Sequence, residues 1–314
     1  MKFTIIEDSL SKEIFDSSHE LLQAHCIDKS IEIFGSNFLL DIVCPLAAYL
    51  SERNSSEMPL KVCFSGGQGS GKTTLSELVQ IALGAYKNKN SVGFSIDDIY
   101  KTYEERLNMS ETIHKLCKVR GVPGTHDIQL GIDTIEELFN ADSETQTLIP
   151  SFSKPQDRRK PKKDWPVFRG RPDFIFFDAW CGGVPPEKDN SWKGPINILE
   201  KEEDPEGIWW KWSNNALKNQ YQDLFSLFDI LIMIEVPDMQ TVFDSRWLQE
   251  QTLAKNLSDP KDLSKIMTKK EVNRFVMHYE RLTHHIFKEV PKIANIVIKR
   301  DKDFMFSFSK IPQR

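Results

Sequence analysis

The sequence has few cysteines, no long apolar run and no excess of positive charge. Five cysteines occur among 314 residues, an odd number without a close C-x-x-C pair, so neither a disulfide framework nor a zinc site is indicated. No apolar run approaches the roughly 20 residues that span a bilayer, so no membrane partner is expected. The formal net charge of -5 gives no reason to expect nucleic acid as a general partner, because binding to the phosphate backbone needs a basic surface.

The N-terminus also lacks the pattern of a secretory signal. Residues 1–10 mix acidic with apolar side chains and contain no basic start followed by an apolar stretch. We therefore expect a cytoplasmic location, with the nucleus as an alternative. Hydrophobic residues make up 39% and charged residues 28% of the chain, a composition typical of soluble globular proteins. The sequence does not indicate the oligomeric state.

The strongest positive signal is a glycine-rich stretch between an apolar run and a helical pattern. Residues 66–73 fit the phosphate-binding pattern G-x-x-x-x-G-K-[ST], in which backbone N–H groups turn inward around an anion. Lys72 is expected to reach the β- and γ-phosphates of ATP, and the Thr73 hydroxyl to coordinate Mg²⁺. The alternative is an accidental match, which the flanking apolar strand and helical pattern disfavour. The predicted nucleotide-binding residues are Gly66, Gly67, Gln68, Gly69, Ser70, Gly71, Lys72, Thr73 and Thr74.

Carboxylates follow two further apolar runs. Residues 91–96 are predicted to form a strand that ends at Asp97 and Asp98, and a second strand ends at Asp178. Because ligands of parallel α/β sheets lie beyond the carboxyl ends of the strands, Asp97 is predicted to accept a proton from a substrate hydroxyl or to bind the metal through water. Asp98 is expected to cap the next helix. Asp178 has the Walker-B arrangement and is predicted to bind Mg²⁺, the alternative being an acid hydrogen-bonded to neighbouring N–H groups.

Three other segments allow two interpretations each. The loop of residues 120–127 is either a substrate wall or an ordinary turn in which Asp127 is an N-cap and His126 a surface histidine. Arg246 is either a lid arginine that neutralises transferred charge or the partner of Glu250 in an i,i+4 ion pair. The basic run at 158–163 is expected to be a mobile, solvated loop rather than a nuclear-import signal or an anion clamp.

The pattern of apolar runs predicts an α/β fold. Buried strands separated by helical stretches imply a mainly parallel sheet with helices on both faces, here a P-loop NTPase fold. We expect a single domain over 1–314, with an N-terminal helical extension at 1–59 and a core at 60–300. Irregular insertions are predicted at about 153–172 and 184–208. The predicted helices cover 9–51, 128–140, 238–256 and a last helix from 268, and the predicted strands cover 60–65, 91–96, 147–152, 173–177, 229–236 and 293–298.

The order of these segments resembles that of one family. The motifs are the glycine-rich stretch, Asp97-Asp98-x-Tyr100, Arg120-Gly-x-Pro-Gly-Thr-His-Asp127, Asp178-x-Trp-Cys-x-Gly183 and the segment 246–250. Together they resemble the plant-type D-glycerate 3-kinases and their fungal ATP-dependent relatives, in the group of uridine kinase, phosphoribulokinase and pantothenate kinase. The resemblance implies that Asp97 activates the acceptor hydroxyl, that Asp178 holds the Walker-B position and that Arg246 is the lid arginine. It places Tyr100, His126, Asp127 and Arg158 on the substrate side.

One segment departs from the family pattern. The family commonly has Tyr-Asp-Lys-Ser, a glycine-rich stretch and Gly-Asp-Arg where this chain has Phe-Ser-Lys-Pro-Gln-Asp-Arg at 152–158. The sequence therefore predicts an ATP- and Mg²⁺-dependent kinase that phosphorylates a hydroxyl of a small metabolite, with a glycerate-like acid as one candidate acceptor. The alternative is an ATP-binding protein or ATPase switch without an acceptor. A GTPase is disfavoured because no [NT]-K-x-D motif occurs.

Overall fold

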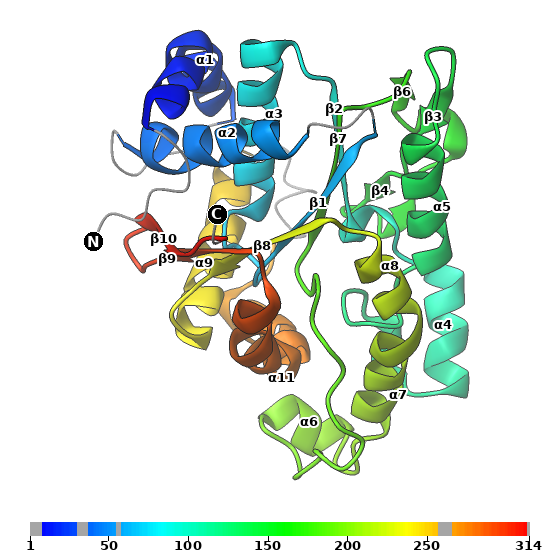
Figure 1. Cartoon of the computed structure of the whole chain (residues 1–314). Coiled ribbons are helices and arrows are strands. Elements are labelled where there is room, and N and C mark those ends of the chain that lie inside the picture. The colour runs from blue at the N-terminus through cyan, green and yellow to red at the C-terminus, as the bar shows by residue number, and fades with distance from the viewer. Residues whose placement is uncertain (1–7, 30–36, 55–57, 257–265, 313–314) are drawn as a thin grey trace.

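A six-stranded sheet forms the centre of the computed structural model, which describes residues 8–29, 37–54, 58–256 and 266–312 (Figure 1). The strand order is β10-β9-β8-β1-β7-β2. These strands are β1 (Leu60–Ser65), β2 (Ser91–Ser95), β7 (Phe174–Ala179), β8 (Ile230–Glu235), β9 (Ile296–Arg300) and β10 (Phe306–Lys310). All neighbouring pairs are parallel except β9 and β10. The mainly parallel α/β sheet that the apolar runs predict is confirmed.

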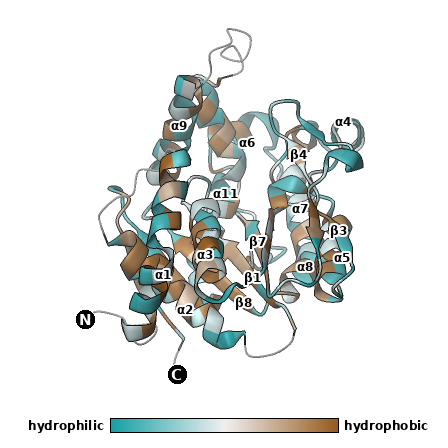
Figure 2. Ribbon diagram, turned by 90° about the horizontal axis from the view of Figure 1, so that it is seen from above, coloured by the Kyte–Doolittle hydropathy of each residue, from teal (hydrophilic) through white to brown (hydrophobic). Residues whose placement is uncertain are grey.

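Helices cover both faces of this sheet because successive strand residues point to opposite sides. In β7, Phe174 and Phe176 join one apolar core with α1, α2 and α3, whereas Ile175 and Phe177 join a second core with α5 and α11. Figure 2 shows the apolar strands β1, β7 and β8 between these groups of helices. The helices are α1 (Asp8–Asp28), α2 (Cys44–Arg53), α3 (Lys72–Lys87), α4 (Tyr103–Thr112), α5 (Ile128–Phe139), α6 (Ile198–Glu203), α7 (Ile208–Ala216), α8 (Gln222–Ser226), α9 (Met239–Asn256) and α11 (Lys269–Ile293).

The N-terminal helical extension differs in detail from the prediction. Instead of one stretch over 9–51, the structure has α1, then a π-helical turn at Leu39–Val43 that continues into α2. Pro45 lies in the first turn of α2, where its missing N–H costs no hydrogen bond, so it starts this helix rather than kinking it. No helix among the described residues combines the length and apolar character needed to cross a bilayer.

The two insertions contain more regular structure than predicted. The first has β4 (Phe152–Ser153) paired with β5 (Arg158–Arg159), and β6 (Val167–Arg169) paired with β3 (Gln146–Leu148). The second contains α6, whose N-terminus is capped by the Asn197 side chain. Ladder hydrogen bonds and caps satisfy backbone groups that a structureless loop would leave to water. The pairing of β4 with β5 also brings Lys154 and Asp157 to a fixed position beside β2.

The C-terminal part also differs from the prediction. The last helix extends to Ile293, the residue at which the final strand was expected to begin. The antiparallel strand β10 was not predicted, because its alternation of Phe306 and Phe308 with serines is too short to distinguish from a loop. This strand places Phe306 beside the glycine-rich stretch, 3.5 Å from the position that a Cβ on Gly71 would take. The C-terminal hairpin therefore lies next to the start of α3.

Candidate active site

The loop of residues 66–71, called here the glycine loop, joins β1 to α3 at the carboxyl edge of the sheet. Gly66 and Gly69 have φ angles of 144° and 73°, which other residues rarely adopt. A Cβ on Gly66 would lie 2.5 Å from the carbonyl oxygen of Ile234, and one on Gly69 would lie 2.7 Å from Cβ of Ser245. The loop therefore has room only for glycine at these positions. Its backbone wraps the N-terminus of α3, as an anion cradle requires.

Three predicted residues meet at this loop. Lys72 is buried, and its Nζ donates a hydrogen bond of 3.1 Å to the carbonyl oxygen of Gly67. The same Nζ lies 3.9 Å from Oδ1 of Asp178, and the Thr73 hydroxyl donates to Oδ2 of that carboxylate. Burial raises the pKa of Asp178, and the Lys72 charge and the Thr73 hydrogen bond oppose this effect. The structure thus brings together the residues predicted to bind phosphate and metal.

The oxygen atoms of Thr73 and Asp178 suit a hard cation. Mg²⁺ prefers oxygen ligands in an octahedron, of which proteins usually supply one or two while phosphates and water supply the rest. Within the described residues, no three His, Cys, Asp or Glu side chains gather closely enough to hold a metal unaided. This donor set therefore fits Mg²⁺ that arrives with a phosphate ligand. The buried Ser70 hydroxyl beside it has no hydrogen-bond partner in the described part of the chain.

Asp97 and Asp98 follow β2 in a short 3₁₀ turn and have separate roles. Asp98 accepts a hydrogen bond of 2.9 Å from the N–H of Ser95, which completes a capping box of the turn to which Asp98 itself belongs. The next helix, α4, is capped by Thr102 instead of Asp98. Burial raises the pKa of Asp98 to about 6. Ser95 pairs with Asp178 across the neighbouring strands, so Asp97 lies at the same edge of the sheet as the glycine loop.

The Asp97 carboxylate already has two protein partners. Oδ1 accepts a hydrogen bond of 2.5 Å from the Tyr100 hydroxyl, and Oδ2 lies 2.8 Å from Nζ of Lys154. Burial raises the pKa of Asp97, but the Lys154 ammonium and these two hydrogen bonds outweigh it, so the pKa lies below its ordinary value. Asp97 is therefore ionised at neutral pH. Lys154 was not among the predicted site residues, although it stands in the segment that departs from the family pattern.

The loop of residues 120–127 forms the wall beside Asp97. The His126 ring stacks on Tyr100 at 4.7 Å between centroids, and burial lowers the pKa of His126 to about 3, so the imidazole is neutral. The Tyr221 hydroxyl lies 2.5 Å from Nδ1 of His126 and accepts the N–H of Gly124. The Tyr221 hydroxyl has one proton and two lone pairs, so its contact with Nδ1 is compatible with either tautomer of His126. The Nε2 atom of His126 is buried without a partner among the described residues.

Asp127 has the N-cap role that was its alternative interpretation. Its carboxylate accepts the N–H of Leu130 at the start of α5, and it pairs with Arg159 at 3.0 Å. Arg158, the predicted substrate-side arginine, is exposed. The arginines that face this wall are its neighbour Arg159 and the loop residue Arg120.

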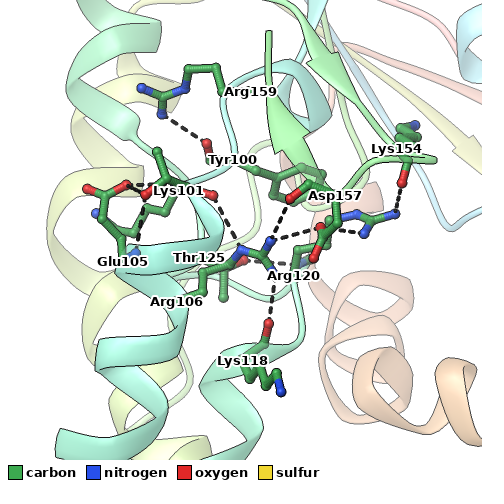
Figure 3. A network of polar contacts seen from close by, with 12 residues as sticks. Tyr100, Lys101, Glu105, Arg106, Lys118, Arg120, Thr125, Lys154, Asp157 and Arg159 are labelled. Carbon is green, nitrogen blue, oxygen red and sulfur yellow. Dashed lines mark hydrogen bonds and ion pairs between the residues drawn. The ribbon is translucent and has the colours of Figure 1, made fainter.

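Figure 3 shows how Arg106 and Arg120 converge on Asp157. The guanidinium groups of these arginines lie 2.8 and 2.6 Å from Oδ1 of Asp157. Arg106 is fully buried and also donates to the carbonyl oxygen of Lys118 at 2.6 Å. One signal for this cluster is present in the sequence, since Arg120 opens the motif at 120–127. The pairing of either arginine with Asp157 could not be read from it.

Arg246 lies on α9 close to the glycine loop. Its guanidinium forms the i,i+4 ion pair with Glu250, which was one of the two interpretations, and lies 5.4 Å from the centroid of the Phe275 ring. Glu250 also accepts the N–H of Met267. The backbone of Ser245 and Arg246 packs directly on Gly69. The predicted lid arginine is therefore near the loop, and its side chain is held by Glu250.

The chain is similar to known proteins in sequence and in fold. No protein-family model matches the sequence. The chain is 28% identical over 246 residues to the uncharacterized kinase mug58 of Schizosaccharomyces pombe, covering 76% of this chain and 85% of that protein. It is 28% identical over 228 residues to the chloroplastic D-glycerate 3-kinase of Arabidopsis thaliana, covering 70% and 46% of the two chains. The predicted resemblance is confirmed.

A third relative and two solved structures agree with it. The chain is 36% identical over 121 residues to the probable ATP-dependent kinase TDA10 of Saccharomyces cerevisiae, covering 35% of this chain and 41% of that protein. The matches thus span less than half the length of the plant and budding-yeast relatives. The YGR205w protein has a TM-score of 0.65 at 24% identity, with 85% of this chain and 96% of that chain covered. D-glycerate 3-kinase from Cryptococcus neoformans has a TM-score of 0.66 at 20% identity, with 85% and 99% covered, and both likenesses show a shared fold.

Proposed function

We propose that this chain is a P-loop kinase that uses ATP and Mg²⁺ to phosphorylate a hydroxyl of a small metabolite. The observation that carries the proposal is the placement of Asp97 directly after β2, the strand next to that of Asp178, whose carboxylate contacts Lys72 and Thr73 beside the glycine loop. The relatives support it because they are named as kinases. The kinase core would be one domain, with the helices before β1 as an extension.

The nucleotide would bind with its phosphates against residues 66–74. The glycine loop and the N-terminus of α3 present backbone N–H groups, and the Lys72 ammonium would exchange the Gly67 carbonyl for β- and γ-phosphate oxygens. Thr73 and Asp178 would hold Mg²⁺, which supplies charge neutralisation between the phosphates when bound. The Thr73 hydroxyl would turn from Asp178 so that both oxygen atoms face the metal.

Asp97 would take the proton of the acceptor hydroxyl. The acceptor oxygen forms a bond to the γ-phosphorus, the bond from that phosphorus to the β–γ bridging oxygen breaks, and ADP leaves with the electron pair. Asp97 is ionised and lies at the edge of the sheet where the transfer would occur. To accept the proton, it would exchange its contact with Lys154 for a contact with the acceptor hydroxyl. Lys154 would then be free to face the transferred phosphoryl group. Arg246 would add a second positive charge after it leaves Glu250.

The wall beside Asp97 favours an acceptor rich in oxygen atoms, such as a glycerate-like acid. His126 has a buried, unpartnered Nε2 atom that a hydroxyl of the acceptor could satisfy, and Tyr100 lies against the same ring. Arg120 and Lys154 add positive charge on the exposed side. Asp127 would hold the wall in place through α5 and Arg159. A hydroxy acid would match this combination of a neutral imidazole and cations better than an uncharged nucleoside.

The test is phosphate transfer from ATP labelled on the γ-phosphate. The purified chain is incubated with Mg²⁺ and, separately, with glycerate, sugar acids, pantothenate and nucleosides, and Lys72→Ala serves as the inactive control. A labelled acid supports the proposal. Release of labelled phosphate alone would instead support an ATPase switch, and ATP binding without either product would support a kinase relative that has lost its acceptor site.

A further inference from the structure

Arg300, at the end of β9, is a buried cation that links two parts of the nucleotide site. Its side chain is 1% exposed. Nη1 donates a hydrogen bond of 3.0 Å to the carbonyl oxygen of Gly69, and Nη2 donates one of 2.9 Å to the Ser245 hydroxyl. Ser245 in turn donates to the carbonyl oxygen of Thr241 one turn earlier in α9. Arg300 therefore fastens the glycine loop to the helix that carries Arg246.

The charge of Arg300 has no carboxylate partner in the described part of the chain. The guanidinium lies 4.3 Å from the centroid of the Phe304 ring, and its Nε is buried without a hydrogen-bond partner. Burial lowers the pKa of Arg300, and the charge of Asp301 only partly opposes this. Hydrogen bonds to neutral groups and a ring contact compensate the burial of a charge only in part. Such a group is stabilised further by a structural counter-charge or by a ligand that supplies one.

A second arginine, which is only partly buried, shows what a structural counter-charge looks like in this fold. Arg281 also lies 4.3 Å from an aromatic centroid, that of Trp192, but its guanidinium pairs with buried Glu200 at 2.6 Å. The two arginines thus share a ring contact, and the more buried of them, Arg300, is the one without a carboxylate. Of these two arginines, only Arg300, which has no carboxylate partner in the described residues, contacts the glycine loop.

The contact with Gly69 bears directly on phosphate binding. In an anion cradle, backbone N–H groups face inward and the carbonyl groups of the same peptides face outward. Arg300 donates to the Gly69 carbonyl, and the N–H of that peptide unit belongs to Ser70, which donates a hydrogen bond of 3.2 Å to the carbonyl oxygen of Gly67. A bound anion would take this N–H from Gly67, and a cation on the carbonyl side favours that exchange because it polarises the peptide and makes the N–H a stronger donor. The nearby Ser70 side chain is itself buried and has no partner in the described residues.

We propose that Arg300 is a positioning residue of the nucleotide site whose buried charge is balanced by the polyphosphate of the bound nucleotide. This inference rests on the proposed function. Arg300 acts through the Gly69–Ser70 peptide and through Ser245, without touching the nucleotide. The contribution of Arg300 to nucleotide affinity therefore grows with the number of phosphates. Loss of Arg300 should weaken the binding of ATP more than the binding of AMP. Because Ser245 precedes Arg246 in α9, the hydrogen bond from Arg300 to Ser245 also positions the backbone from which the Arg246 side chain extends.

Two substitutions separate charge from hydrogen bonding. Arg300→Gln removes the charge and keeps a donor, whereas Arg300→Lys keeps the charge. Calorimetric titration with ATP, ADP and AMP in Mg²⁺, without acceptor, is combined with the unfolding midpoint of each nucleotide-free protein. For Arg300→Gln we expect an unchanged or higher midpoint and an ATP dissociation constant raised at least about tenfold, with a smaller change for AMP. Arg300→Lys is expected to recover most of the ATP affinity.

The matched control is Arg281→Gln, which removes the paired arginine. It leaves Glu200 buried without its partner, so the nucleotide-free midpoint should fall while the ATP dissociation constant stays that of the wild type. In steady-state assays Arg300→Gln should raise KM for ATP more than it lowers kcat, because the acceptor side is untouched.

The outcomes distinguish this inference from the proposed function. ATP binding by the wild type tests the proposed function, and its absence overturns both. If the wild type binds ATP and Arg300→Gln binds it equally well, Arg300 is only a structural residue and the inference is overturned. A lower midpoint with unchanged nucleotide affinity leads to the same conclusion. Should the Gln variant fail to fold, a Lys variant that folds but loses discrimination between ATP and AMP also overturns the inference.

Discussion

The two halves of the candidate site are built in different ways. The proposed nucleotide half, made of the glycine loop, Lys72, Thr73 and Asp178, depends mainly on backbone conformation between β1 and α3, and Asp178 joins it from β7. The proposed acceptor half, made of Asp97, Tyr100, His126 and Lys154, depends on side chains from separate segments that contact one another. All of the first half except Asp178 is encoded in eight consecutive residues. The second requires the packing of the whole domain to bring its members together.

The largest expected effect breaks the nucleotide half. Lys72→Ala removes the ammonium that contacts Gly67 and lies near Asp178, so charge on the transferred phosphate would go uncompensated. We expect phosphate transfer to fall by about a thousandfold or more. The measurement is single-turnover transfer from labelled ATP, with the unfolding midpoint as control for folding. Transfer within about tenfold of the wild type would contradict the assignment of Lys72.

The next effect breaks the acceptor half while leaving the other half intact. Asp97→Asn keeps the shape and the hydrogen bond from Tyr100 but cannot take a proton. We expect kcat to fall by about a hundredfold to ten-thousandfold, with the ATP dissociation constant within about twofold of the wild type. Asp98→Asn is the matched control, because Asp98 is the neighbouring carboxylate and accepts a hydrogen bond within the turn. Unchanged phosphate transfer by Asp97→Asn would mean that another group accepts the proton.

A smaller effect sharpens the role of the Lys154 contact. The ammonium holds the pKa of Asp97 down, so Lys154→Met should raise that pKa. Because Asp97 must be ionised to accept a proton, the fall in kcat/KM at low pH should begin at a higher pH in the variant. Lys163→Met, an exposed lysine of the same insertion, is the control and should leave the profile in place. A profile that does not move would show that Asp97 and Lys154 are not coupled during turnover.

The smallest effect concerns stability beside the site. The pKa of Asp98 is raised from 3.8 to about 6 by burial, so the folded state binds this proton more tightly than the unfolded state does. Its contribution to stability is therefore present below pH 4 and is lost as pH rises to about 6, by at most about 3 kcal/mol. Asp98→Asn should flatten this part of the curve of unfolding free energy against pH. The unfolding free energy is measured by urea titration at each pH. If it depends on pH in the variant as it does in the wild type, groups other than Asp98 cause that dependence.

The contrast between local motifs and long-range packing also explains how far the sequence could predict the fold. Apolar runs gave the five parallel strands, since residues such as Phe174 to Phe177 are buried on both faces and leave a continuous signal. They could not give β10 or the β4–β5 pair, which are short and whose pairing depends on partners elsewhere in the chain. Helix α4 was missed because its only buried side chain is Arg106.

The same reasoning applies to the site. The positions of Lys72, Thr73 and Asp178 follow from local motifs at strand ends, and the structure brings them together. The partner of Arg246 follows from the i,i+4 spacing to Glu250. The partners of Asp97 and His126 do not follow, because which neighbour satisfies a polar side chain is decided by packing. Arg300 carries no local signal at all, since a single arginine at the end of a strand is compatible with an exposed edge. Its burial becomes visible only with the hairpin that follows it.

The position of Arg300 also affects when the nucleotide site matures during protein synthesis. Arg300 follows Gly69 by 231 residues, and Phe306 beside Gly71 comes later still. A nascent chain that has exposed the glycine loop, α3 and even Asp178 still lacks the side chain that anchors the loop from behind. If the proposed nucleotide site depends on Arg300, cellular nucleotide would help folding only after Arg300 has been synthesised, because a ligand stabilises only a state that binds it. Chaperone-dependent stages before that point would be insensitive to nucleotide supply.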